Sequence, residues 1–187
     1  QALKIYKSAL KIDSENYIIN NNLGKLYFKI NVVEKAIKCL KTSMLLNPNL
    51  AEPYYNLCEI YDKTNKLDQF AETLTRVPIV VKKDPSIQLK KGQLKFRHKQ
   101  YSQCINTLLG IDIQKLSTAK RSILYDLLGK SYDHIGDFNQ AFLNFSIMNE
   151  NNSNIANSLG IHGENYKNNI VNLIQNFLKT PSVIKAK

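Results

Sequence analysis

The sequence predicts an all-α fold, a right-handed α-solenoid of antiparallel helix pairs. Three observations support this prediction. Apolar residues recur at spacings of three and four, as they do on one face of a helix. Small residues recur at a nearly constant interval along most of the 187-residue chain. Residues that favour turns separate the helical stretches. One helix pair cannot bury both of its faces, so each pair is expected to stack on the next.

The clearest helix pair is expected between Tyr125 and Phe145. Gly136 followed by Asp137 divides it, because Gly accepts positive φ and Asp can cap a helix. We expect Gly129 and Ala141 to let the two helices touch closely, with aromatic residues filling the flanks. The residues expected on the contacting faces are Tyr125, Leu128, Gly129, Tyr132, Phe138, Ala141 and Phe145.

Small residues mark the same position in earlier units. Gly24, Cys58 and Gly92 are 34 residues apart, and Gly129 follows 37 residues after Gly92, which indicates three inserted residues. A helix–turn–helix unit of this period resembles the tetratricopeptide repeat. Further residues that fit the family pattern are Leu23, Tyr27, Ala36, Leu40, Ser43 and Pro48, then Tyr54, Leu57, Tyr61 and Leu74, then Tyr101, Cys104 and Leu108. Phe70 stands where the pattern has a small Ala.

This period divides the chain into successive units. They are the second helix of a truncated repeat (1–16), two repeats (17–50 and 51–84), a degenerate repeat with a loop (85–121), the clearest repeat (122–155), and a capping or linking helix with a tail (156–187). The chain begins inside a unit and without Met, so we expect it to be a fragment of a longer protein.

Local signals place the helix ends. Ser14 or Asn16 can cap a helix that runs to about Ile30, and Pro48 ends the helix expected over 33–46. Asp84 followed by Pro85 is typical of a helix start.

Three segments are expected outside the paired helices. We expect an extended linker at 79–83, a loop from Gly110 to Ser117, and a second loop over the Asn- and Ser-rich residues 149–158. A last helix at 164–179 carries one apolar stripe and would cover the open end of the stack. Its apolar residues are Tyr166, Ile170, Leu173, Ile174 and Phe177.

Composition and motifs argue against a catalytic, metal-binding or cofactor-binding site in this chain. The three cysteines are widely spaced and two occupy small-residue core positions, which favours free thiols in a reducing, cytoplasmic setting. The sequence has no Gly-rich phosphate loop, no cluster of residues at metal-ligand spacing, no Gly-x-Ser-x-Gly elbow and no apolar run long enough to span a membrane. We therefore expect no catalytic, metal or cofactor residue here.

The expected function is binding of a protein or peptide on the concave side, which the first helix of each repeat lines. The candidate residues for this groove are Asn21, Lys25, Tyr55, Asn56, Glu59, Lys90 and Lys130, with Phe28, Asp62, Gln93 and Asp133 beside them. Asn21, Lys25, Asn56 and Lys90 resemble the residues with which some family members clamp a terminal carboxylate. The match is incomplete, because Asn and Lys are exchanged between the first two places and Ser86 replaces a further Lys. A generic polar groove is the favoured interpretation.

The net charge of +11 allows an acidic partner as an alternative. The densest basic segment, residues 82–99, contains five lysines and Arg97 besides Lys90. It lacks the interleaved exposed aromatic residues of a nucleic-acid site. We favour lysines that simply solvate the helix surfaces, and nucleic acid is the weakest of the candidate partners.

The last third resembles the final repeat of bacterial proteins that join tetratricopeptide repeats to a C-terminal sulfotransferase domain. The similar residues run from about Leu127 to Phe177 and include Gly136-Asp137-Phe138 and Ala141-Phe142. This resemblance implies a parent enzyme, similar to a protein-tyrosine sulfotransferase, that uses 3′-phosphoadenosine 5′-phosphosulfate. Its donor-binding loop would lie beyond Lys187, so the resemblance assigns no cofactor residue to this chain. A free-standing adaptor that binds a peptide or helix is the alternative.

Overall fold

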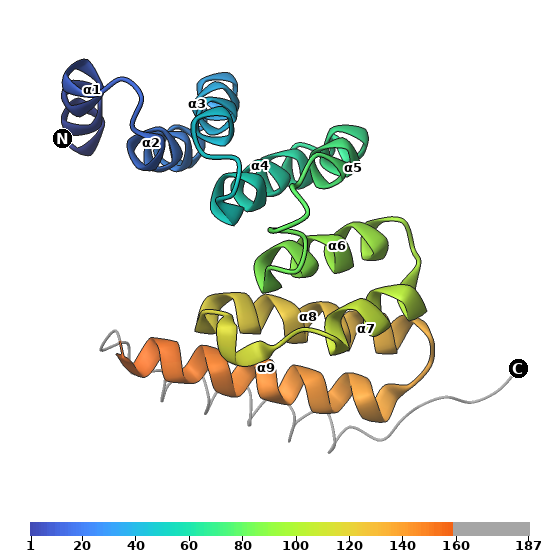
Figure 1. Cartoon of the computed structure of the whole chain (residues 1–187). Helices are drawn as coiled ribbons and strands as arrows, with labels where there is room; N and C mark the ends of the chain where they lie inside the picture. The colour runs from blue at the N-terminus through green and yellow to red at the C-terminus, as the bar shows by residue number, and fades with distance from the viewer. Residues whose placement is uncertain (159–187) are drawn as a thin grey trace, which may run out of the picture.

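All regular structure in the part of the chain that the computed structural model describes, residues 1–158, is helical (Figure 1). Side chains are described as far as residue 153. The helices are α1 (Ala2–Ile12), α2 (Tyr17–Lys29), α3 (Val33–Leu46), α4 (Ala51–Lys63), α5 (Leu67–Thr75), α6 (Pro85–Arg97), α7 (Tyr101–Leu109), α8 (Thr118–His134) and α9 (Phe138–Ser158), with a short 3-10 turn, η1 (Ile113–Lys115), before α8. The predicted all-α solenoid is confirmed.

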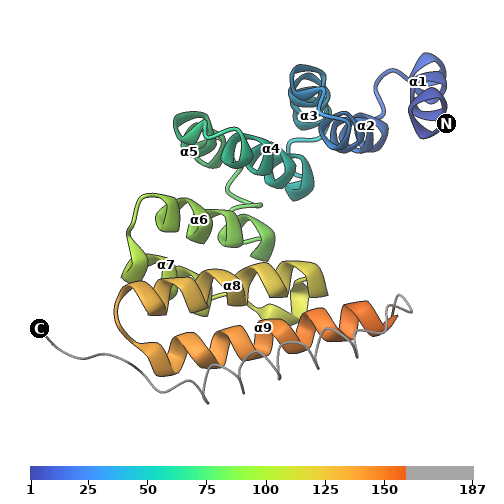
Figure 2. The ribbon, with the colours of Figure 1, turned by 180° about the vertical axis from the view of Figure 1, so that it is seen from behind.

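The helices form pairs that follow one another in a curved row (Figures 1 and 2). The pairs are α2–α3, α4–α5, α6–α7 and α8–α9, and α1 packs on α2. Each second helix also contacts the first helix of the following pair. The successive first helices α2, α4, α6 and α8 contact one another more closely than the second helices do. They therefore form the inner face of the curve, and this set of four helices is called the inner face below.

A small residue meets a large one at the centre of three pairs. A Cβ atom added to Gly24 would lie 2.8 Å from Leu40 Cγ, and one added to Gly129 would lie 2.6 Å from Phe145 Cε1. Gly92 meets Leu108 in the same way. The residue that Gly129 approaches is thus Phe145, sixteen positions later, and not Ala141 as the sequence suggested. Ala141 is also buried.

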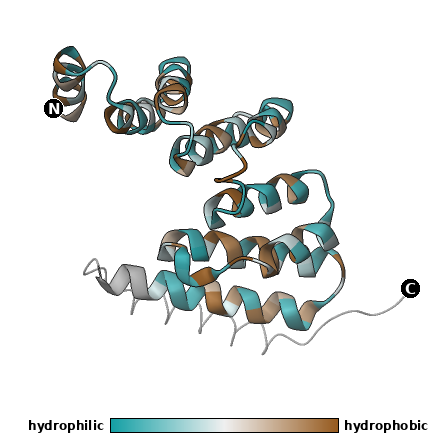
Figure 3. Ribbon diagram, in the orientation of Figure 1, coloured by the Kyte–Doolittle hydropathy of each residue, from teal (hydrophilic) through white to brown (hydrophobic). Residues whose placement is uncertain are grey.

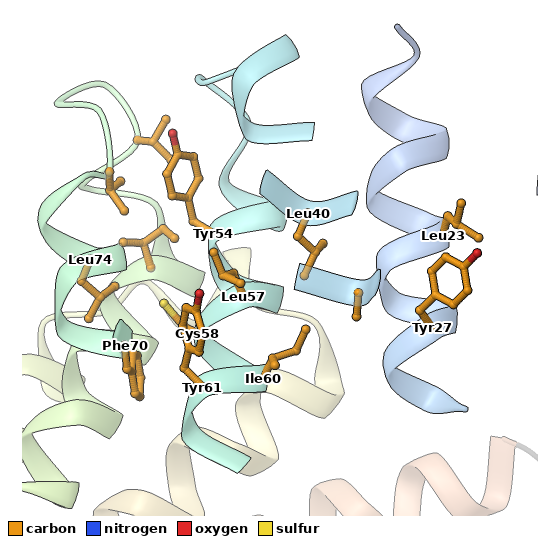
Figure 4. Packing of buried hydrophobic residues seen from close by; sticks show 14 residues of the cluster. Leu23, Tyr27, Leu40, Tyr54, Leu57, Cys58, Ile60, Tyr61, Phe70 and Leu74 are labelled. Carbon is orange, nitrogen blue, oxygen red and sulfur yellow. The ribbon is translucent and has the colours of Figure 1, made fainter. Parts of the chain in front are cut away.

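The second pair fills the same space differently. Cys58 takes the position of the glycines and Phe70 takes the position of Ala36 and Ala141. Both side chains are fully buried (Figure 4). In this pair both helices thus carry a larger side chain at these positions than α2–α3 or α8–α9 do.

The buried side chains form two hydrophobic clusters. One is built by α2 to α5 and contains the predicted core residues Leu23, Tyr27, Leu57 and Tyr61 (Figure 4). The other is built mainly by α6 to α8 and contains Leu128. Most helices therefore carry both hydrophobic residues, which can pack in these clusters, and hydrophilic residues (Figure 3). Of the other positions expected from the repeat pattern, Tyr54 is buried, Tyr125, Tyr132 and Phe145 are half-buried, and Pro48 is exposed. Phe138, which the sequence placed on the contacting face of the last pair, is 69% exposed.

The turn between the two helices of each pair uses one repeated position with positive φ. Asn31, Asn65 and Lys99 have φ of 59°, 55° and 59°, and Gly136 has φ of 82°. Asn and Gly tolerate this region, whereas Lys is strained there. Helix starts also agree with the sequence: Asn16 Oδ1 accepts a hydrogen bond from Ile19 N at 3.0 Å. Asp84 caps α6 with Pro85 at its first position.

Two expected loops differ in the structure. Residues 79–83 form turns and not an extended linker, because Val81 N and Lys82 N donate to Pro78 O at 2.9 and 3.0 Å. These turns place Val81 in the core. Residues 149–158 continue α9. The segment from 138 to 158 has no Pro or Gly to end the helix, and Asn151 Nδ2 donates to Ile147 O at 3.1 Å within the helix.

The outer face of α9 is exposed within the described part of the chain. Phe142 occupies the repeat position of Ile105 in α7, yet its exposed fraction is 76%, against 5% for Ile105. α8 packs on α7, whereas no described first helix follows α9. The covering helix predicted at 164–179 and the rest of 159–187 lie outside the described residues, and that helix remains a prediction.

The close contact at Gly129 gives a direct test. We expect Gly129→Leu to lower the free energy of unfolding by about 1–3 kcal/mol, because its side chain would collide with Phe145. Gly110→Ala is the matched control, since its Cβ would meet neighbours only at 3.7 Å. Urea unfolding followed by circular dichroism measures both. A Gly129→Leu variant as stable as Gly110→Ala would contradict the packing.

Candidate interaction face

The inner face carries a chain of polar contacts between α4 and α6. Lys90 Nζ on α6 donates to Glu59 on α4 and to Gln93 Oε1 at 2.9 Å. Gln93 Nε2 donates to Asp62 Oδ2 at 2.7 Å. Arg97 lies 3.3 Å from the other oxygen of Asp62, an ion pair whose geometry falls short of a hydrogen bond. Four groove candidates from the sequence therefore tie two repeats together.

Lys90 is the most deeply buried charge in this chain of contacts. Its side chain is fully buried, whereas Glu59 keeps a quarter of its surface exposed and also pairs with Lys63 at 3.0 Å. Burial alone would raise the pKa of Glu59, but the charges and hydrogen bonds of Lys90 and Lys63 outweigh it and lower that pKa. The carboxylate is thus held ionised beside the buried ammonium.

A second set of contacts joins α2 to α4. Asn56 Nδ2 donates to Asn21 Oδ1 at 2.9 Å, and Lys25 Nζ pairs with Glu52 Oε1 at 3.0 Å. Asn21 is buried, while Lys25 and Glu52 are about half exposed. Burial would raise the pKa of Glu52, yet its contacts with Lys25 and Asn21 lower it. The side chains that resemble a carboxylate clamp are therefore all paired within the protein.

Tyr55 packs under two lysines. Lys90 Nζ and Lys120 Nζ each lie 4.3 Å from the centroid of its ring, within the range of a cation–π contact. Burial, followed by the negative charge of Glu59, raises the pKa of Tyr55, so its hydroxyl stays neutral. The repeat pattern does not indicate Lys120, because α8 begins at Thr118, whereas the period places the start of that repeat at Ser122. Ser117, which caps α8, is the signal that could have revealed it.

The remaining candidates lie apart from these contacts. Lys130 pairs with Asp126 at 2.7 Å along the same helix. In the basic segment 82–99, Arg97 joins the inner-face contacts and Lys95 donates to Thr107 Oγ1 at 2.9 Å. Lys91 has a lowered pKa, first because of burial and then because Lys82 and Lys95 are near. Lys82, Lys91 and Lys95 thus lie near one another, whereas Lys90 and Arg97 take part in the contacts between α4 and α6.

Two open hollows accompany these contacts. One, of about 590 Å³, lies beside the N-terminal ends of α4 and α6. The other, of about 530 Å³, lies between α3, α4 and α5 and is lined partly by Tyr54, Leu57 and Tyr61.

Within the described residues no group of three or more His, Cys, Asp or Glu side chains could hold a metal ion. None of the described helices is long and apolar enough to cross a membrane.

Comparison with known proteins identifies the repeat. The family model for the tetratricopeptide repeat matches residues 17–50. The chain has a tetratricopeptide-repeat fold. No relative is found among curated protein sequences. The matched repeat is α2–α3; the three later helix pairs keep its turn position, and α6–α7 and α8–α9 also keep its small-to-large contact.

Solved tetratricopeptide-repeat structures resemble the chain over most of its length. MamA is 23% identical and aligns over 83% of this chain and 90% of its own, with a TM-score of 0.60. TTC0263, a thermophilic protein of Thermus thermophilus, is 19% identical over 80% of this chain and 81% of its own, with a TM-score of 0.64. A repeat protein of Parabacteroides merdae is 19% identical over 86% of this chain and 65% of its own, with a TM-score of 0.62. These likenesses establish the fold.

The Glu59–Lys90 pair predicts a measurable loss of stability. Glu59→Gln leaves the buried Lys90 ammonium without its anion, so we expect a loss of about 3 kcal/mol in urea unfolding at pH 7. Glu72→Gln is the matched control, because it removes an exposed pair within α5 and should change stability by less than about 1 kcal/mol.

The same pair sets a pH dependence. The folded pKa of Glu59 is lower than the unfolded value of about 4.3. Its contribution to stability is therefore fully present above the unfolded pKa and is lost as the pH falls through the folded one. The difference between wild type and Glu59→Gln should shrink below about pH 4. A difference that stays constant there would contradict the ion pair.

Proposed function

We propose that this chain is a non-catalytic scaffold that binds a protein or peptide along the inner face. The observation that supports this most is the separation of two groups of polar side chains on that face. The buried side chains, which include Lys90 and Asn21, already form contacts between neighbouring repeats. A second group, including Lys25, Glu52 and Lys63, remains about half exposed along successive first helices. In this proposal the first group stabilises the arrangement of neighbouring repeats, and the second group can contact a ligand.

The binding mode follows from this separation. A ligand that used Asn21, Asn56 and Lys90 as a clamp would have to displace hydrogen bonds that are already formed, which leaves buried polar groups unpaired. A ligand that runs over the exposed side chains displaces only water and weak surface pairs. We therefore favour an extended segment held by side chains at the edges of the inner face.

A single charge reversal can distinguish binding on the inner face from binding elsewhere on the protein. We expect Lys25→Glu to weaken binding of octamer peptides selected from a random array by about tenfold, which corresponds to about 1.4 kcal/mol. Lys38→Glu makes the same charge change on α3, outside the inner face, and should leave the affinity unchanged. Fluorescence anisotropy measures both. Equal losses in the two variants, or an array without binders, would refute the proposed face.

The sulfotransferase resemblance supports a narrower proposal for the parent protein. The similar residues include the Gly136 turn and Ala141, both of which belong to the last described helix pair. In this proposal the repeats present an acceptor to a catalytic domain that uses 3′-phosphoadenosine 5′-phosphosulfate. The coding sequence after Lys187 tests it. A donor-binding loop within about 100 residues, roughly one domain, is expected. A stop codon directly after Lys187 would favour the free-standing adaptor.

A further inference from the structure

The hollow beside the N-terminal ends of α4 and α6 joins three helix pairs. Its volume is about 590 Å³. The turns at 79–83 form one wall, and Lys120 reaches into it from α8. We call it the Lys120 hollow. Its lining includes Glu52, Val80, Lys83, Asp84, Ser86 and Lys120.

Lys120 is a half-buried cation with no carboxylate within 4.0 Å among the described side chains. Burial lowers its pKa, and the positive charges of Lys90 and Lys25 add to this, although Asp84 and Glu52 oppose them. Its ammonium rests on the ring of Tyr55. Water and an aromatic face compensate such a charge less well than an anion does.

The two acidic residues of the hollow already have partners. Glu52 pairs with Lys25 at 3.0 Å. Asp84 accepts hydrogen bonds from the backbone N–H and the hydroxyl of Ser86, because it caps α6. Neither carboxylate lies within ion-pair distance of Lys120, although the negative charge of both favours its ammonium, so an anion from outside the chain could pair with Lys120 without breaking an existing ion pair.

An apolar surface adjoins the cation. Ile79 and Val80 are 77% and 70% exposed, because the turns that bury Val81 point these two side chains outward. Val80 is also part of the wall of the hollow. A cation and exposed aliphatic side chains therefore lie next to each other at the edge of the inner face.

We propose that the Lys120 hollow binds an acidic side chain of an extended peptide, with a neighbouring aliphatic side chain of that peptide on Ile79 and Val80. The proposal rests on the function proposed above and names the chemistry of the ligand. Of the two lysines in the lining of the hollow, Lys83 is exposed and Lys120 is half-buried, so one partly desolvated ammonium is available to the carboxylate of the ligand. A phosphate dianion fits less well, because Glu52 and Asp84 line the same hollow and would repel its second charge.

An array of acetylated octamers with C-terminal amides tests this proposal. Each octamer carries one Glu and one Leu at varied spacing in a Gly/Ser background, and matched sets replace Glu by Gln or by phosphoserine. Binding to the Glu set is expected to exceed binding to the Gln set by about tenfold or more, as for a charged hydrogen bond. Lys120→Met should abolish this preference, whereas Lys130→Met, which removes a lysine paired along α8, should keep it.

The results distinguish failure of the acidic-ligand proposal alone from failure of both that proposal and the scaffold proposal. If Gln octamers bind as well as Glu octamers, or phosphoserine octamers bind better, the acidic-ligand proposal is wrong and the scaffold proposal stands. The same holds if Lys120→Met keeps the preference for Glu. If no octamer of the array or of the random array binds, both proposals fail. Lys120→Met should change the melting temperature little, because removal of a desolvated cation offsets the loss of its contact with the Tyr55 ring.

Discussion

Each helix pair depends on how closely its two helices can approach. A glycine on the first helix faces a large side chain sixteen positions later, as Gly24 faces Leu40 and Gly129 faces Phe145. An added methyl group would overlap the facing side chain, so the helix separation and the register are fixed together. The other features of the fold, including the turn position and the inner face, follow from repeating this contact.

Repetition also explains why polar residues meet between repeats. Side chains about one period apart on neighbouring first helices can meet, as Asn21 and Asn56 do. Side chains about one helical turn short of a period can also meet, and where they are complementary, as Glu59 and Lys90 are, they form a contact that a hydrophobic pair could replace. We interpret these contacts as features that set the register and curvature, and the exposed residues beside them as the binding surface.

The sequence predicted the features that depend on local chemistry. The helix Val33–Leu46, the cap at Asn16 and the Gly136 turn agree with the structure, because each is determined by residues within a few positions. Features that depend on neighbouring repeats were predicted less well. The partner of Gly129 was placed one turn too early, and the helix over 149–158 was taken for a loop.

The candidate site was predicted only in part. The period placed Glu59, Lys90, Asn21 and Asn56 on the inner face, yet it could not reveal that these residues bind one another, since that depends on the distances between helices. Lys120 was missed because it belongs to an extra turn at the start of α8, outside the repeat pattern. The contacts of a residue in such an additional turn become apparent only when the positions of the neighbouring helix pairs are known.

The most direct test of the account is a double-mutant cycle between Gly24 and Leu40. Gly24→Ala, Leu40→Ala and the double variant would be compared by urea unfolding. If the close approach of these residues sets the helix pair, the added methyl group is costly beside Leu and tolerated beside Ala, so the coupling energy should reach about 1 kcal/mol or more. Strictly additive effects would contradict the account.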